Sequence, residues 1–362
     1  MRILITGGGT GGHLFPGIAV ADAVADVSPG AGILFAHTGR EFEKKALDAA
    51  GYQHLGLGTQ GFLGRGLKNQ LKAGFRLVWA FLRSLGVLVG FRPHVVLGVG
   101  GYASVPCMAA ARCLFIPAAL AEQNALPGRA NRLMAKMAKK VYATFPESRE
   151  YFPPGKVEVT GNPVRKALME AIEKHGRNED VDERFHVLVI GGSQGARGIN
   201  RAVCDSLDRL PPERFMFTHQ TGDLDYDDVD LAHRNWGGGS VVRPFFDDMD
   251  RRYREADFVV CRSGATTLAE VCALGKAALL VPYPFAADNH QEKNARAMED
   301  EGAAEVILER DLSGDVLARR IEYYAGRPGI LDDMRQRARK LGRPRAAYDI
   351  AEDLLALVRK TG

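Results

Sequence analysis

Short continuous runs of apolar residues alternate with longer segments of mixed polarity along the whole chain. Continuous runs are typical of parallel strands that are covered on both faces. The runs predict strands at Arg2–Thr6, Ile33–His37, His94–Gly98, Ala118–Ala121 and Val141–Ala143, and a second series at Phe185–Ile190, Arg214–His219, Val241–Arg243, Phe258–Cys261, Ala278–Val281 and Glu305–Ile307. The repeated strand–helix alternation indicates an α/β protein with two Rossmann-like, doubly wound parallel sheets.

The length of the chain, 362 residues, also favours two domains over a single core. The boundary is expected near the segment Thr160–Arg165, which precedes a highly charged stretch. The apolar N-terminal run reaches Gly7 too soon for a signal peptide or a membrane-spanning helix. The formal charge of +4 is too small to indicate a nucleic-acid partner. The five cysteines have no C-x-x-C spacing, which favours reduced thiols in a cytoplasmic protein.

Four glycine-containing loops follow predicted strands. They are Gly7–His13, Gly98–Ser104, Gly191–Arg197 and Ser263–Thr267. Open α/β sheets bind ligands at the carboxyl ends of their strands, and main-chain N–H groups at a helix N-terminus attract anions. We therefore expect a cleft whose main chain holds phosphate groups.

The first loop also matches the dinucleotide fingerprint G-x-G-x-x-G. The fingerprint requires a carboxylate at the end of the second strand, where this chain has Thr38-Gly39-Arg40. Arg40 could meet a 2′-phosphate, so a nicotinamide-dependent oxidoreductase remains an alternative.

The loop at Ser263 indicates a nucleoside diphosphate. We expect Ser263 to cap the following helix, whose N-terminus would hold the diphosphate. Glu270 follows about two turns later, at a spacing that allows its carboxylate to accept both ribose hydroxyls.

Two side chains are candidates for the general base. His13 lies where the first loop meets its helix, and a neutral imidazole can take a proton from a hydroxyl. Glu122 ends a predicted strand, where burial would raise its pKa. The D-x-D pairs within Asp223–Asp230 and at Asp248 and Asp250 are interpreted as solvated carboxylates, so no metal is expected to be required.

The segment Leu71–Val89 predicts a helix with an unusually wide apolar face. The apolar positions cover roughly 200°, against the ~100° stripe that packing on one core needs. The residues expected to meet a membrane are Phe75, Val78, Trp79, Phe81 and Leu82, with the cations Lys72, Arg76 and Arg83 beside them. Apolar surface edged by cations suits docking on anionic lipid.

Seven motifs occur in an order that closely resembles the MurG family, the bacterial glycosyltransferases of peptidoglycan synthesis. They are Gly7–His13 with Pro16, Gly100–Tyr102, Glu122–Asn124, Gly161–Arg165, Gly191–Ala196, Arg262–Ala265 and Ala287–Gln291. The resemblance implies a glycosyltransferase-B fold of two Rossmann-like domains facing across a cleft, with the last helix returning to the first. The domains would then be residues 1–163 plus 343–362, which bind acceptor and membrane, and residues 164–342, which bind UDP-N-acetylglucosamine.

The implied reaction transfers N-acetylglucosamine from UDP-N-acetylglucosamine to the muramic acid 4-hydroxyl of lipid I. It inverts the anomeric carbon, forms lipid II and needs no cofactor. The resemblance also implies a peripheral protein on the cytoplasmic face of the plasma (inner) membrane, with roles in cell shape and cell division and with cell-wall synthesis or division complexes as candidate partners.

Site residues are implied where the motifs match. For the donor they are Thr10, Gly11, Gly12, Asn124, Arg165, Ser193, Phe246, Ala265, Thr266, Thr267, Leu268, Ala269, Glu270 and Gln291. For the acceptor they are Gly12, His13, Gly100, Gly101 and Tyr102. Phe246 would bracket the uracil through its main chain, and Gln291 would bind a sugar hydroxyl. Ala121 departs from the family, which often has histidine there, and this favours His13 as the base.

Two further alternatives remain at the level of the sequence. A UDP-sugar 2-epimerase can share this architecture, but it would need neither a lipid acceptor nor the basic apolar helix. A non-catalytic nucleotide-binding module would transfer no sugar.

Overall fold

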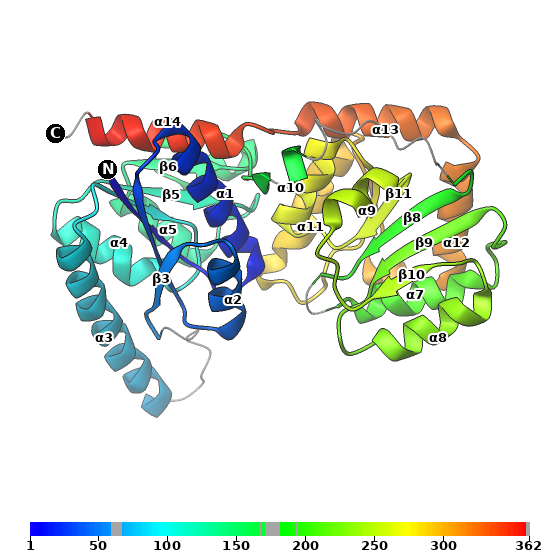
Figure 1. Cartoon of the computed structure of the whole chain (residues 1–362), viewed down its shortest axis with the longest axis horizontal. Helices are drawn as coiled ribbons and strands as arrows, with labels where there is room; N and C mark the ends of the chain where they lie inside the picture. The colour runs from blue at the N-terminus through cyan, green and yellow to red at the C-terminus, as the bar shows by residue number, and fades with distance from the viewer. Residues whose placement is uncertain (59–66, 167, 171–181, 193–194, 360–362) are drawn as a thin grey trace. The chain divides into compact units, whose positions relative to one another are not determined.

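The computed structural model describes residues 1–58, 67–166, 168–170, 182–192 and 195–359 (Figure 1). The chain divides into two compact units, Met1–Lys166 with Arg343–Gly362, and Ala167–Gly342. The sequence-based boundary lay slightly earlier, after position 163.

The N-terminal unit contains a parallel sheet, which has seven strands in the described part of the chain. The strand order is β3-β2-β1-β4-β5-β6-β7. The strands are β1 (Arg2–Thr6), β2 (Gly32–His37), β3 (Gln53–Gly56), β4 (Val95–Gly98), β5 (Ala118–Glu122), β6 (Lys140–Ala143) and β7 (Val157–Val159). The helices are α1 (Gly11–Val27), α2 (Glu41–Ala49), α3 (Leu67–Phe91), α4 (Ser104–Cys113), α5 (Arg129–Met137), η1 (Pro146–Tyr151) and α14 (Ala346–Arg359).

Helices cover both faces of this sheet, as its continuous apolar strands require. On one face α1 and α14 pack on the sheet and against each other (Figure 1). Ile350 and Leu354 of α14 are fully buried in this layer. On the other face α3, α4 and α5 enclose a second apolar core. The C-terminal helix therefore completes the N-terminal unit.

The C-terminal unit repeats the architecture with a six-stranded parallel sheet in its described residues, in the order β10-β9-β8-β11-β12-β13. The strands are β8 (Phe185–Ile190), β9 (Phe215–Gln220), β10 (Val241–Arg243), β11 (Phe258–Cys261), β12 (Ala277–Leu280) and β13 (Glu305–Val306). The helical segments are α7 (Arg197–Leu207), α8 (Tyr226–Trp236), α9 (Met249–Glu255), α10 (Ala265–Leu274), η2 (Ala287–Asn289), α11 (His290–Asp300), η3 (Glu309–Asp311), α12 (Gly314–Ala325) and α13 (Pro328–Leu341).

The strand order of each sheet reverses direction at one point. In the N-terminal unit this switch lies between β1 and β4, and in the C-terminal unit between β8 and β11. Open α/β sheets bind ligands at such switch points, outside the carboxyl ends of the strands. The four glycine-containing loops predicted from the sequence follow these four strands, so each unit carries two of them at its switch point. The expected fold class is confirmed.

Candidate functional site

The two loops at the switch point of the N-terminal unit pack main chain against main chain. Gly101 has φ +81°, and a Cβ built there would overlap the carbonyl oxygen of Gly8. A residue with a side chain would push the loops apart, so the glycines permit this close approach. The loop after β1 and the loop after β4 therefore form one surface.

His13 lies on this surface, in the first turn of α1. Its Nδ1 is 3.1 Å from the hydroxyl of Thr10, and a Cβ at Gly100 would lie 3.0 Å from its Nε2. Thr10 is the N-cap residue of α1, but its side chain makes no capping bond to the helix. The imidazole is half-buried, and the Tyr102 ring in the neighbouring loop is exposed. The expected acceptor residues His13, Gly100 and Gly101 are thus brought together.

Glu122 ends β5 and is 2% exposed. Its Oε1 accepts from the main-chain N–H of Asn124 at 2.9 Å, and its Oε2 accepts from Nδ2 of Asn131 at 2.7 Å. Burial raises the pKa of Glu122 to about 7, although the hydrogen bonds from Asn124 and Asn131 oppose the shift. The sequence-based expectation of a raised pKa is confirmed, and both carboxyl oxygens are engaged with protein donors.

Asn131 was not among the predicted site residues. It lies in α5, and its side-chain amide donates a hydrogen bond to Glu122 and is close to Gly100. A single asparagine within a basic helix gives no sequence signal for such a role. Glu43 is a second residue that sequence analysis missed: it accepts a hydrogen bond from the main-chain N–H of Gly9 at 2.6 Å.

In the C-terminal unit, α10 begins at Ala265 as expected, but Ser263 does not cap it. The N-cap residue is Gly264, and no side chain caps the helix. Ser263 is fully buried, and its hydroxyl donates instead to the main-chain oxygen of Gln291 at 2.8 Å. The prediction of a serine cap was wrong because the side chain turns toward α11.

Glu270 lies further along α10 and is buried rather than exposed. The phenolic hydroxyl of Tyr253 donates to its Oε2 at 3.2 Å. Thr266 and Thr267 in the first turn of α10 are half-buried, as is Ala269. Leu268 is buried and its N–H donates to Gly264, so of the predicted positions on α10 it is the least suited to contact a ligand.

The remaining donor residues have mixed placements. The main-chain N–H of Phe246 donates to Oε1 of Gln220 at 3.2 Å, and Oε1 of Gln291 accepts from the N–H of Tyr283 at 3.0 Å. The guanidinium of Arg165, in the N-terminal unit, lies over the Phe15 ring. Ser193 lies outside the described residues. Within the described residues, no cluster of His, Cys, Asp and Glu side chains is arranged to hold a metal ion.

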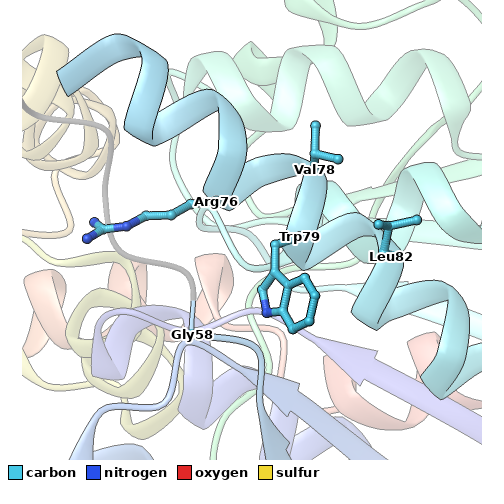
Figure 2. Close-up of a pocket in the computed structure, with 5 residues that line it drawn as sticks. All are labelled: Gly58, Arg76, Val78, Trp79 and Leu82. Atoms are coloured by element: carbon cyan, nitrogen blue, oxygen red, sulfur yellow. The ribbon is translucent and has the colours of Figure 1, made fainter. Parts of the chain in front are cut away.

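Helix α3 presents an exposed apolar surface. Figure 2 shows Trp79 turned toward Gly58, with Val78 and Leu82 on the same helix. These residues and Arg76 line a cavity of about 380 Å³. We call Val78, Trp79 and Leu82 the α3 patch; Trp79 is 67% exposed.

The other predicted membrane residues divide into three cases. Arg76 and Arg83 are exposed beside the α3 patch. Phe81 differs from the expectation because it is only partly exposed and packs on the core beneath α3. The side chains of Lys72 and Phe75 lie outside the described part of the chain. Among the described helices, none has the length and apolarity needed to span a bilayer.

Comparison with known proteins identifies a family that covers most of the chain. The glycosyltransferase family 28 N-terminal domain matches residues 3–143, and the family 28 C-terminal domain matches residues 186–350. A relative from Thermodesulfovibrio yellowstonii, the UDP-N-acetylglucosamine–N-acetylmuramyl-(pentapeptide) pyrophosphoryl-undecaprenol N-acetylglucosamine transferase, is 42% identical and covers 99% of this chain and 100% of its own.

Two solved structures give the same fold. The crystal structure of MurG from Acinetobacter baumannii has a TM-score of 0.78 and 28% identity, covering 98% of this chain and 99% of that one. A UDP-GlcNAc 2-epimerase from Neisseria meningitidis, bound to UDP-GlcNAc, has a TM-score of 0.70 but only 16% identity, covering 98% of this chain and 100% of its own. The second likeness shows the fold alone.

Proposed function

Since the chain belongs to the MurG family of glycosyltransferases, we propose that it transfers N-acetylglucosamine from UDP-N-acetylglucosamine to the muramic acid 4-hydroxyl of lipid I. The product is lipid II, the precursor of peptidoglycan. One observation carries the proposal. The chain is related to these transferases over nearly its whole length, and each of its units has two glycine-containing loops at its switch point.

The donor binds to the C-terminal unit in this proposal. The N-terminus of α10 carries no side-chain cap, so its N–H groups and helix dipole stabilise the diphosphate. Glu270 accepts the ribose hydroxyls, and its bond from Tyr253 orients the carboxylate. The same helix terminus stabilises UDP as it leaves, and the transfer needs neither a metal nor a cofactor.

The acceptor diphosphate binds to the joined loops of the N-terminal unit, beside His13. The 4-hydroxyl oxygen attacks the anomeric carbon as the bond to the UDP oxygen breaks, and the hydroxyl proton passes to Nε2 of His13. The bond between Nδ1 and the Thr10 hydroxyl orients the imidazole for this step. A single displacement from the face opposite UDP inverts the anomeric configuration from α to β.

Glu122 serves a different purpose in this scheme. Both of its oxygens accept hydrogen bonds from protein groups, and the side chain is buried. We therefore assign Glu122 to orienting Asn124 and Asn131 rather than to abstracting the proton. Both asparagines lie beside the loops Gly7–His13 and Gly98–Ser104, which we call the acceptor loops.

The protein docks on the cytoplasmic face of the plasma membrane through the α3 patch. The exposed apolar side chains enter the lipid interface while Arg76 and Arg83 meet anionic headgroups. This places the acceptor loops near a substrate whose undecaprenyl chain stays in the bilayer. Cell-wall synthesis or division complexes are candidate partners there.

The proposal is tested by incubating the protein with UDP-[¹⁴C]N-acetylglucosamine and a lipid I analogue, and omitting each in turn. Label should enter the lipid product only when both substrates are present. The absence of transfer, with formation of UDP-N-acetylmannosamine instead, would indicate the 2-epimerase. That alternative is not favoured, because the epimerase structures resemble this chain in fold only.

A further inference from the structure

A buried carboxylate lies directly beneath the first glycine loop. Glu43, in the first turn of α2, is 0% exposed. Its Oε1 accepts from the N–H of Gly9 at 2.6 Å. Its Oε2 accepts from the Thr38 hydroxyl at 2.5 Å and from the N–H groups of Gly39 and Arg40 at 3.0 and 2.9 Å. One side chain thus ties the loop after β1 to the loop after β2.

These contacts leave little freedom for the glycine loop. A Cβ at Gly8 would overlap Oε1 of Glu43, so the carboxylate lies against the main chain of Gly8 as well as Gly9. The Arg40 guanidinium also donates to the Gly9 carbonyl at 2.6 Å. Because the carbonyl of Gly8 packs on Gly101, a shift of this segment would also move the loop after β4.

Two imidazoles connect the Glu43 carboxylate to the protein surface. Nδ1 of His37 lies 3.1 Å from Oε2 of Glu43, and Nε2 of His37 lies 3.1 Å from Nδ1 of His54. Nε2 of His54 lies 3.0 Å from Asp48, a carboxylate that is exposed on α2. Burial raises the pKa of Glu43, but the bonds from His37, Thr38, Gly9 and Arg40 outweigh burial and lower it to about 2. Glu43 is therefore an ionised, fully bonded anchor.

We propose that Glu43 is a positioning residue for the acceptor: it fixes the main chain of Gly8 and Gly9, and through it the loop at Gly101, in the conformation that receives the acceptor diphosphate. The inference rests on the proposed function. Glu43 does not itself touch the substrate, since its oxygens are occupied by protein donors. Pre-organised N–H groups bind an anion without a cost of ordering the loop, so loosening the anchor should weaken acceptor binding and spare the donor.

The test compares Glu43→Gln with Glu41→Gln in the full chain. Glutamine keeps the size of the side chain but puts an NH₂ donor where Glu43 offers an acceptor. Glu41 lies in the same turn of α2 and is exposed, so its variant removes the same charge without touching the loop. We expect the KM for a lipid I analogue to rise by about tenfold or more in Glu43→Gln and to stay unchanged in Glu41→Gln. The KM for UDP-N-acetylglucosamine should not change in either variant.

A change in the acceptor KM without a change in the donor KM separates positioning from mere destabilisation. Destabilisation would lower the active fraction of the protein, and hence kcat, without changing one KM alone. If Glu43→Gln does not fold, Thr38→Val removes a single bond to Oε2 and should raise the same KM by a smaller factor. An unmoved acceptor KM, or an equal change in both KM values, overturns the inference. A wild-type protein that transfers no sugar would instead overturn the proposed function.

Discussion

His13 and Glu122 are ionisable side chains near the acceptor loops, and they lie in different environments. The imidazole is half-buried and contacts Thr10 and the loop at Gly100. The carboxyl group is buried and bonded on both oxygens. In the proposed mechanism the imidazole, rather than the bonded carboxyl group, therefore takes the proton from the acceptor hydroxyl.

Replacing His13 with alanine should therefore lower kcat and leave UDP binding unchanged. Loss of a general base typically costs about 10²- to 10⁴-fold in rate. Transfer assays and calorimetric titration with UDP measure the two quantities. His94→Ala is the matched control, because His94 precedes β4 at the amino end of the same sheet. Unchanged kcat in His13→Ala would remove His13 as the base.

The raised pKa of Glu122 predicts that the free energy of unfolding depends on pH. Its pKa is raised from 4.5 to about 7 in the folded protein, so folding favours the protonated form. The corresponding stabilisation is complete below pH 4.5 and is lost as pH rises through 7. The free energy of unfolding should fall by about 3 kcal/mol over this range because of Glu122. Glu122→Gln does not titrate, so the wild type should lose about this much more stability than the variant in denaturant titrations at pH 5 and pH 8. Parallel curves for the two proteins would contradict the assignment.

The sequence indicated the environment of a candidate residue where the surrounding pattern of apolar residues fixed its place in a strand or helix. Glu122 ends an apolar strand, so its burial could be predicted. Glu43 and Asn131 act through tertiary contacts that no local pattern reports: Glu43 bonds Gly9, which lies 34 residues away, and Asn131 of α5 bonds Glu122 at the end of β5. Ser263 was misassigned because serine is a common N-cap residue, whereas here the contact with α11 determines where its hydroxyl points.

At the level of elements, the strands of the described chain were predictable except for the two edge strands of the N-terminal sheet. β1, β8, β10 and β11 match the expected bounds, and the other expected strands shift by one residue at an end or slide by one position. β3 and β7 were missed. Both lie at the edges of the N-terminal sheet and are partly exposed, so they lack the continuous apolar run that two-sided burial imposes.

The α3 patch gives the prediction at this scale. Trp79→Ser combined with Leu82→Ser should reduce co-sedimentation with vesicles containing anionic lipid, because exposed apolar side chains supply the insertion energy. Leu231→Ser is the matched control: Leu231 is a leucine of similar exposure on the acidic helix α8. The control should bind vesicles like the wild type. Equal binding by the folded double variant would exclude the patch as the docking surface.

At the scale of the whole molecule, the chain leaves the N-terminal unit near Lys166 and returns to it at Arg343. The C-terminal unit is thus continuous in sequence, and the N-terminal unit depends on α14, a helix that follows the whole C-terminal unit in the chain. Asp353 of α14 strengthens this return, because it accepts hydrogen bonds from Nζ of Lys140 and from the Tyr142 hydroxyl, both at 2.6 Å. The amphipathic pattern of α14 could be read from the sequence, but its return to the first unit was implied by the family resemblance and not by that pattern.

This connectivity predicts that a destabilising substitution in α14 lowers the stability of the N-terminal unit only. Leu354→Ala removes a fully buried side chain and should destabilise the N-terminal unit by about 2–5 kcal/mol. UDP binding should persist, because the proposed donor residues of α10 belong to a unit with its own apolar core. Glu352→Ala, on the exposed side of α14, serves as the control and should change stability little. Calorimetric unfolding with and without UDP distinguishes the cases: UDP should raise the transition of the C-terminal unit equally in all three proteins, while only Leu354→Ala lowers that of the N-terminal unit. If both transitions fell together, the units would be one cooperative structure.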